Sequence, residues 1–137
     1  MAYEDLYRLS VHAAIFDNKD NVLMVKTTCG AKGWTFPGGA IDPGETIYET
    51  VHRECRECIE ELGQEIDVSY LSGVYYHKLH NSQAFVLRCK LKNEHPIRLS
   101  SEHSEYRFFS IKEHKDSHRI KAEDCLNFER SVFSRKF

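Results

Sequence analysis

Hydrophobic and polar positions along this chain predict strands on both sides of a central helix. Residues 8–16 (RLSVHAAIF) form an apolar, β-compatible run, and residues 22–25 form a second one after a polar turn. These two runs are predicted to pair as a hairpin. Two further strands are expected at residues 68–77 and 84–90, joined around residues 80–82, and a short aromatic strand at residues 106–110.

Helices are expected in two places. Residues 46–62 show the strongest helical pattern, and an amphipathic segment near residues 122–135 predicts a second helix that packs through Cys125, Phe128 and Val132. Strands that flank one helix and precede another are typical of an α+β or mixed α/β sandwich rather than a regularly alternating parallel sheet.

The central helix carries signals at both ends. Thr46 and Glu49 have the spacing of a capping box, and Gly63 follows the last turn as a stop. At about 100° per residue, five apolar positions fall within an arc of roughly 80° and predict a buried face. These positions are Ile47, Val51, Cys55, Cys58 and Leu62.

An acidic stripe runs directly beside this apolar face. Its members are Glu54, Glu57 and Glu61. Like charges at this spacing repel one another, and partial burial beside an apolar face strengthens the repulsion. A bound divalent cation such as Mg²⁺ would remove it, because hard cations prefer carboxylate oxygens. The alternative is a solvated charged face, held by Arg53–Glu57 and Arg56–Glu60 pairs.

The segment before the helix favours the ligand-binding interpretation. Residues 30–39 are glycine-rich and are predicted to form a loop. Gly38, Gly39 and Gly44 allow the backbone to approach a ligand closely, and Pro37 and Pro43 stiffen the turn. A glycine-rich loop joined to an acidic helix at fixed spacing is a stronger signal than either feature alone.

These residues resemble the Nudix box. The box positions matched here are Gly39, Glu45, Arg53, Glu54, Cys55 and Glu57. The approach segment WTFPGG at residues 34–39 and the stretch at residues 101–109 also resemble family segments. The resemblance covers nearly the whole chain and implies one domain over residues 1–137, with the box at residues 39–63 and a Nudix-type α/β/α sandwich containing a mixed sheet.

The box departs from the family pattern in its second half. Cys58 stands where a second glutamate is expected, and Gly63 arrives three residues late, as if the helix carried one extra turn. Two registers therefore compete. In the first the metal ligands are Glu54, Glu57 and Glu61, and in the second they are Glu57, Glu60 and Glu61. The capping box favours the first register, and Glu57 belongs to both.

The resemblance implies hydrolysis of a phosphoanhydride bond in a nucleoside triphosphate or another nucleoside diphosphate derivative. It implies Mg²⁺ or Mn²⁺ held by the glutamates, with the Gly39 carbonyl as an added ligand. Glu57, Glu54 and Arg53 are the expected catalytic group, with Arg53 orienting a glutamate. Gly38, Gly39 and Glu45 are expected in the substrate-binding loop. Glu102 and Glu105 are additional candidates for the acid or base.

Composition limits the other possibilities. The formal net charge of −2 gives no basic excess for nucleic acid or anionic lipid, and no run approaches the ~18 apolar residues of a membrane span. An odd count of five cysteines and an N-terminus unlike a signal peptide predict reduced thiols in the cytoplasm. The expected partner is a nucleotide-type small molecule, and the protein is expected to be a monomer or homodimer.

Three other interpretations remain open. A non-catalytic Nudix-fold module would bind a nucleotide or a partner without cleaving it, and a Nudix-fold isomerase is a further option. Cys55 and Cys58 form a C-x-x-C sequence, which in other settings binds zinc. Because both cysteines lie in the apolar stripe, buried thiols are favoured over a zinc site. His103, His114 and His118 are expected at the surface, although one of them is a candidate base. Residues 26–32 and 75–82 are expected to select the substrate.

Overall fold

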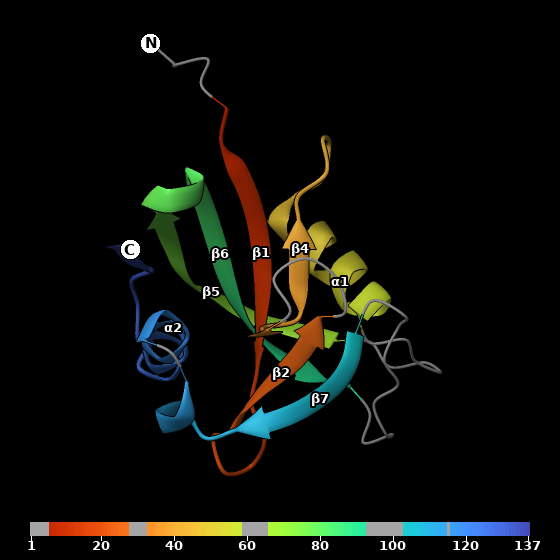
Figure 1. Ribbon diagram of the computed structural model, residues 1–137, viewed down its shortest axis with the longest axis vertical. Coiled ribbons are helices and arrows are strands. Elements are labelled where there is room, and N and C mark those ends of the chain that lie inside the picture. The colour runs from red at the N-terminus through yellow and green to blue at the C-terminus, as the bar shows by residue number, and fades with distance from the viewer. Residues whose placement is uncertain (1–5, 28–32, 59–65, 93–102, 115) are drawn as a thin grey trace.

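The computed structural model describes residues 6–27, 33–58, 66–92, 103–114 and 116–137, which form two β-sheets and two α-helices (Figure 1). Along the chain the elements are β1 (Arg8–Ile15), β2 (Val22–Thr27), β3 (Trp34–Thr35), β4 (Gly38–Ala40), α1 (Ile47–Cys58), β5 (Ile66–His77), η1 (Lys78–His80), β6 (Ser82–Leu91), β7 (His103–Phe109), η2 (Ile111–Glu113), α2 (Asp116–Leu126) and β8 (Phe133–Lys136).

The larger sheet has the strand order β4-β1-β6-β5-β8 and is mixed. Strand β1 runs parallel to β6 and antiparallel to β4, while β5 runs antiparallel to β6 and parallel to β8. The predicted hairpin at residues 68–77 and 84–90 is therefore confirmed as β5 and β6. Pairing of Val11 with Gly39 and of His12 with Gly38 places the glycine-rich segment beside β1.

The smaller sheet corrects the first predicted hairpin. Its order is β3-β2-β7, so β2 pairs with β3 and β7 rather than with β1. One isolated antiparallel bridge joins Phe16 and Val22 across the turn, as in a hairpin. Beyond this bridge the chain passes from the larger sheet to the smaller one. Four successive residues from Val22 to Val25 are fully buried, so β2 is covered on both faces. Such a run identifies a strand without indicating its neighbours.

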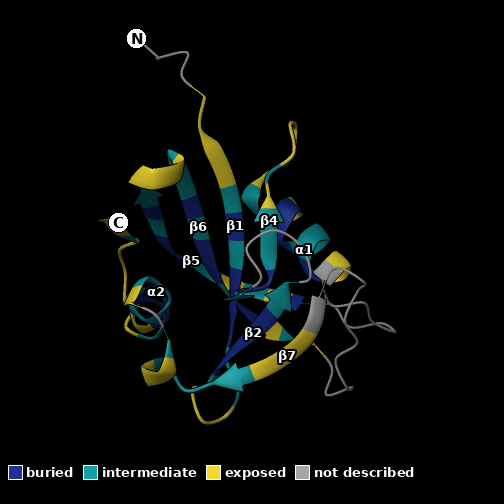
Figure 2. Cartoon of the chain, in the orientation of Figure 1, coloured by how far each residue is buried: buried dark blue, intermediate teal, exposed yellow. Residues whose placement is uncertain are grey.

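Helices α1 and α2 lie on opposite sides of the strands (Figure 1). Val51 and Cys55 of α1 pack with Val11 and Leu87 on one face of the larger sheet. Cys125 of α2 packs with Ala14, Tyr75 and Val86 on the other face. Figure 2 shows buried positions on β1, β2 and β6 between the helices. The predicted α+β sandwich with a mixed sheet is confirmed.

The C-terminal helix differs from its prediction. It spans Asp116–Leu126 instead of residues 122–135, and Phe133–Lys136 form strand β8 along β5. Cys125 is buried as expected, but Phe128 lies beyond the helix, stacked on Tyr70 with ring centroids 4.4 Å apart. Val132 is 44% exposed. The apolar period fails here because α2 buries Lys121 and Asp124 alongside its apolar residues.

Candidate active site

Strand β4 and helix α1 meet where two glycines face crowded surroundings. A side chain at Gly38 would clash with the Val11 carbonyl oxygen, and one at Gly39 would clash with the carboxyl group of Glu54. Glycine is required at Gly38, because the obstacle there is the Val11 backbone, whereas a side chain at Gly39 would displace the Glu54 carboxylate, which lies directly against the β4 backbone. The described residues of the predicted glycine-rich loop at residues 30–39 include strand β3 and the first two residues of β4.

The start of α1 is fixed by the predicted capping box. The Glu49 backbone N–H donates to Thr46 Oγ1, and the Thr46 N–H donates to Glu49 Oε1, each over 3.1 Å. Gly44 precedes this turn with φ +90°, which L-residues rarely adopt. Thr50 is fully buried, and its hydroxyl lies 3.0 Å from Thr46 O and 3.1 Å from Glu45 Oε1. The cap thus sets the register of α1 against β4.

Arg53 joins the acidic side chains of this site. Its guanidinium donates to both Glu45 oxygens over 2.8 and 2.9 Å, and to Glu54 Oε1 over 2.9 Å. It also donates to the Ala40 carbonyl over 3.0 Å and reaches Glu57 Oε2 at 3.4 Å. Hydrogen bonds from Arg53 lower the pKa of Glu45 to about 2, and the carboxylates raise the pKa of Arg53. One guanidinium therefore orients three glutamates.

Glu54 and Glu57 have different environments. The Glu54 side chain is 15% exposed, beside β4, whereas that of Glu57 is 56% exposed, one turn further along α1. Both supply hard carboxylate oxygens, those of Glu54 next to the backbone of Gly39 and those of Glu57 beside Arg53. The missing Cβ of Gly39 leaves its peptide close to the Glu54 carboxylate. This donor set suits Mg²⁺ or Mn²⁺, although the described residues contain no cluster of three or more His, Cys, Asp or Glu side chains arranged around a common metal position.

The remaining predicted site residues divide into two groups. Glu105 is exposed on β7 and pairs with Lys26 across the strands at 3.5 Å. Glu60, Glu61, Glu102 and Gly63 lie outside the described residues, as does the end of the predicted helix at Leu62. The choice between the two registers therefore stays a prediction. Cys55 is buried, in agreement with its place in the apolar stripe.

Sequence reasoning missed several partners of the site. Asp42 lies 3.3 Å from Arg53, and Thr50 and the Ala40 carbonyl complete the hydrogen bonds around Glu45 and Arg53. Of these partners, Thr50 could have been suspected from the sequence, because it precedes Val51 and therefore lies near the buried face of the helix. The Ala40 carbonyl left no signal, because backbone groups carry no side-chain pattern.

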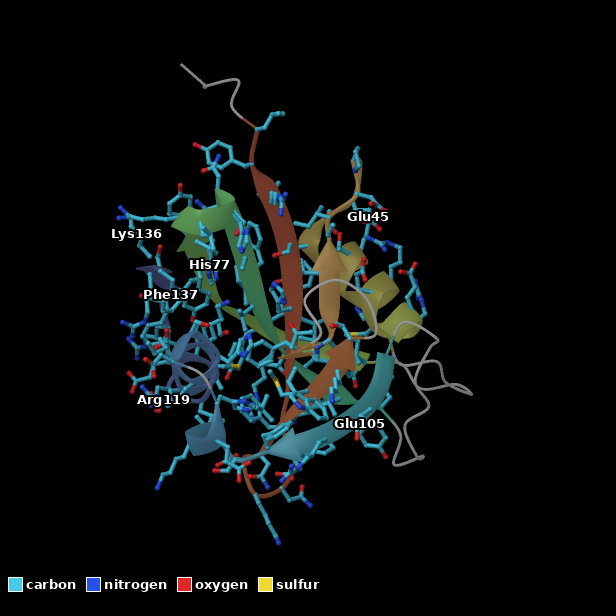
Figure 3. The ribbon with its side chains drawn as sticks, viewed as in Figure 1. Glu45, His77, Glu105, Arg119, Lys136 and Phe137 are labelled. Carbon is cyan, nitrogen blue, oxygen red and sulfur yellow. The ribbon has the colours of Figure 1, made fainter. Side chains whose placement is uncertain are left out.

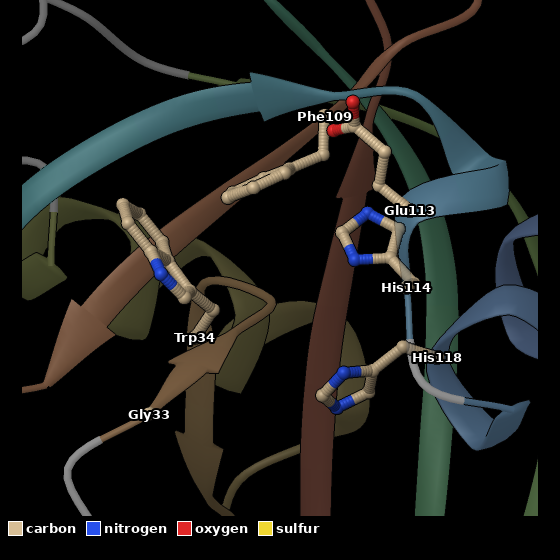
Figure 4. A pocket seen from close by; sticks show the side chains of 6 residues that line it. All are labelled: Gly33, Trp34, Phe109, Glu113, His114 and His118. Carbon is tan, nitrogen blue, oxygen red and sulfur yellow. The ribbon is translucent and has the colours of Figure 1, made fainter.

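One cavity lies at strands β1 and β4, and another lies between β3, the end of β7 and the start of α2. One, of about 450 Å³, is lined by Ser10, Gly39, Ala40 and five neighbours: Arg8, Leu9, Ile41, His80 and Ser82. The other, of about 280 Å³, is lined by Gly33, Trp34, Phe109, Glu113, His114 and His118 (Figure 4). His114 and His118 were expected at the surface, but both are half-buried here, and His114 Nε2 is buried without a hydrogen-bond partner.

Comparison with known proteins identifies the family. The chain matches the NUDIX domain over residues 6–127, and it therefore belongs to the Nudix family, as its box predicts. A "MutT-like protein" of Streptomyces ambofaciens is 33% identical over 85 residues, which are 62% of this chain and 53% of that protein. This chain thus matches about half the length of that relative.

Solved structures share the fold. A Nudix hydrolase from Nitrosomonas europaea superimposes with a TM-score of 0.77 at 18% identity, covering 98% of this chain and 81% of that one. An ADP-ribose pyrophosphatase from Streptococcus suis superimposes with a TM-score of 0.68 at 20% identity, covering 96% and 100%. None of the helices within the described ranges has the length and apolar character needed to cross a membrane.

Proposed function

We propose that this Nudix protein is a metal-dependent pyrophosphohydrolase that cleaves a phosphoanhydride bond in a nucleoside triphosphate or another nucleoside diphosphate derivative. The observation that carries the proposal is the Glu54 carboxylate, held against Gly39 of β4 and joined through Arg53 to Glu57. Family membership and the MutT-like relative support the same reaction class.

In this proposal Glu54 and Glu57 hold Mg²⁺ or Mn²⁺, with the Gly39 carbonyl and Glu61 as further ligands. When bound, the metal neutralises the diphosphate and increases the acidity of an attacking water. Arg53 keeps the two carboxylates in position through charge-assisted hydrogen bonds. Gly38, Gly39 and Glu45 form the loop that the diphosphate approaches, although the Glu45 carboxylate itself is engaged by Arg53.

The proton acceptor in this proposal is a carboxylate of the α1 group, Glu54 or Glu57. The Glu54 side chain is 15% exposed. Glu57, more open to solvent, remains accessible to metal and substrate. Glu102 and Glu105 are retained as alternatives, and Glu105, on β7, pairs with Lys26.

The proposal extends to the setting of this chemistry. Residues 1–137 act as one Nudix domain with its box at residues 39–63, in the first of the two registers. The substrate is a nucleotide-type small molecule, the protein is a monomer or homodimer, and it works in the cytoplasm.

A hydrolysis screen tests the proposal. Nucleoside triphosphates, oxidised nucleotides, dinucleoside polyphosphates, ADP-ribose and nucleotide sugars are incubated with and without Mg²⁺ or Mn²⁺. Glu57→Gln is expected to remove most turnover while leaving folding nearly intact. Glu123→Gln on α2, which also removes an exposed carboxylate, serves as the matched control and should keep full activity.

Either result of the screen is informative. Turnover that needs metal, is lost in Glu57→Gln and is kept in Glu123→Gln supports the proposal and names the substrate class. Near-wild-type turnover of Glu57→Gln contradicts both registers. No turnover of any substrate by a folded, metal-binding wild type favours the non-catalytic binding module instead.

A further inference from the structure

A cluster of basic side chains lies on the side of the larger sheet that α2 covers. It consists of His12 on β1, His77 on β5, and His118 and Lys121 on α2, and we name it the histidine–lysine cluster. Lys121 Nζ lies 2.9 Å from His77 Nε2, and His12 Nε2 lies 3.0 Å from the Ser10 hydroxyl oxygen. Figure 3 shows His77 and Phe137 near α2, away from Glu45 and α1.

Lys121 is the unusual member of this cluster. It is 5% exposed, and it forms no ion pair with any described residue. Its ammonium contacts the His77 imidazole and lies 5.7 Å from the Tyr75 ring centroid and 5.8 Å from that of Phe137. Burying a charge without a counter-charge is costly, so folding alone gives no reason to keep a lysine here.

The nearest carboxylate on the same helix does not compensate this charge. Asp124 accepts two hydrogen bonds from Arg135, over 2.7 and 2.8 Å, and a third from the Tyr75 hydroxyl over 2.9 Å. Burial lowers the pKa of Lys121 to about 8, and burial together with the neighbouring cations lowers the pKa of His12 to about 3. The cluster is therefore rich in hydrogen-bond donors and lacks negative charge.

The cluster is open to ligands at its rim. His12, His77 and His118 are partly exposed, and Lys121 is buried. Ser10, the hydrogen-bond partner of His12, lines the 450 Å³ cavity, and His118 lines the 280 Å³ cavity in Figure 4. The cluster thus lies between the two cavities, with a buried donor at its base.

Its place in the sheet relates it to the proposed catalytic group. Val11 pairs with Gly39, against which Glu54 lies, and His12 pairs with Gly38 one residue away. Successive side chains of a strand point to opposite faces. The cluster and the Glu54 carboxylate therefore lie on opposite faces of the same two strands, and β4 is the edge strand around which a ligand can reach both.

We propose that the histidine–lysine cluster binds an oxygen acceptor that carries full or partial negative charge, in the part of the substrate that lies away from the cleaved diphosphate. Lys121 donates to this oxygen, and His12 and His77 position it. The inference rests on the proposed function for the identity of the substrate, but not for the binding itself. Two sources share this chemistry: an oxyanion such as phosphate, and a ring carbonyl of a nucleobase.

The test measures binding without metal and without turnover. Orthophosphate and the uncharged nucleoside uridine are titrated into the full chain, with calorimetry and the imidazole NMR signals of His12 and His77 as readouts. At least one probe is expected to bind and to shift these signals. Lys121→Met should weaken its binding about tenfold, because a hydrogen bond to a charged donor is lost. Lys112→Met, at an exposed lysine on η2, should leave binding unchanged.

Thermal unfolding separates binding from a structural role. Lys121→Met should be as stable as the wild type or more stable, because it replaces an unpaired buried ammonium by an apolar side chain of similar length. Orthophosphate binding identifies an oxyanion as the ligand, and uridine binding identifies a ring carbonyl. The proposal is overturned if neither probe shifts the two imidazoles, or if Lys121→Met loses stability but keeps the wild-type affinity. Hydrolysis plays no part in this test, so its outcome is independent of the Glu57→Gln result.

Discussion

At the scale of single residues, the candidate site depends on how one arginine distributes its hydrogen bonds. Arg53 contacts Glu45, Glu54 and Glu57 as well as the Ala40 carbonyl. The bidentate contact with Glu45 fixes the guanidinium, and the fixed guanidinium then orients the other two carboxylates. Both oxygens of the Glu45 carboxylate are engaged by Arg53, and the place of Glu45 in the substrate-binding loop stays a prediction.

Glu45 should make stability depend on pH in acid. Its pKa falls from 4.5 to about 2 on folding because Arg53 donates to its carboxylate. A carboxyl group with a depressed pKa in the folded state stabilises the protein above its unfolded pKa, and this stabilisation is lost as the pH falls from 4.5 through about 2. The free energy of unfolding, measured by denaturant titration across this range, should fall more steeply for the wild type than for Glu45→Gln.

Parallel pH profiles for the two proteins would show that Glu45 and Arg53 do not form this pair in solution. Glu129→Gln serves as a control, since it removes an exposed carboxylate far along the chain. Its profile should follow that of the wild type.

At the scale of elements, helix α1 depends on its first turn more than on intrinsic helix preference. The reciprocal hydrogen bonds of Thr46 and Glu49 satisfy two backbone N–H groups that would otherwise lack partners at the helix start. Val51 and Cys55 then bury the apolar stripe against the larger sheet. The position of Glu54 relative to Gly39 follows from these two constraints together.

Thr46→Ala should reduce the free energy of unfolding by about 1 kcal/mol, because the Glu49 N–H loses its side-chain acceptor. Urea denaturation measures this change. Thr46→Ser keeps the hydroxyl and should restore most of the lost stability. If alanine and serine at this position are equally stable, the cap does not contribute in solution and cannot explain the register of α1.

The elements that could be predicted from sequence are those whose signals are local. The capping box and the apolar stripe specify α1, and the β-compatible runs specify β5 and β6 with their antiparallel pairing. Strand β8 and the true limits of α2 could not be predicted in this way. Lys121 and Asp124 occupy buried positions of α2, so its apolar period is interrupted, and the pairing of β8 with β5 is a contact between distant segments.

The candidate site shows the same division. Spacing along one helix identifies Glu54, Glu57 and Arg53, since residues three and four apart share a face. The histidine–lysine cluster draws its members from β1, β5 and α2, and no spacing along the chain relates His12 to Lys121. Asp42 and the Ala40 carbonyl are likewise found beside Arg53 only after the chain has folded.

At the scale of the whole molecule, Asp124 joins three elements that are far apart in sequence. Its carboxylate, 4% exposed on α2, accepts hydrogen bonds from Tyr75 on β5 and from Arg135 on β8. Strand β8 is the outer strand of the larger sheet, and among the described strands it pairs with β5 alone. The attachment of β8 therefore depends on this buried carboxylate as well as on its backbone hydrogen bonds. The same contacts hold α2, which carries His118 and Lys121 of the histidine–lysine cluster, against β5 and β8.

Asp124→Asn should lower the free energy of unfolding by about 2 kcal/mol, because a buried acceptor of charge-assisted hydrogen bonds becomes neutral. Amide hydrogen exchange should accelerate first in residues 133–136 and in the residues of β5 that pair with them, while α1 keeps its protection. Glu123→Gln, one residue away on the exposed side of α2, should change stability by less than about 0.5 kcal/mol. Equal exchange of β8 in Asp124→Asn and the wild type would show that the strand is held by its backbone pairing alone.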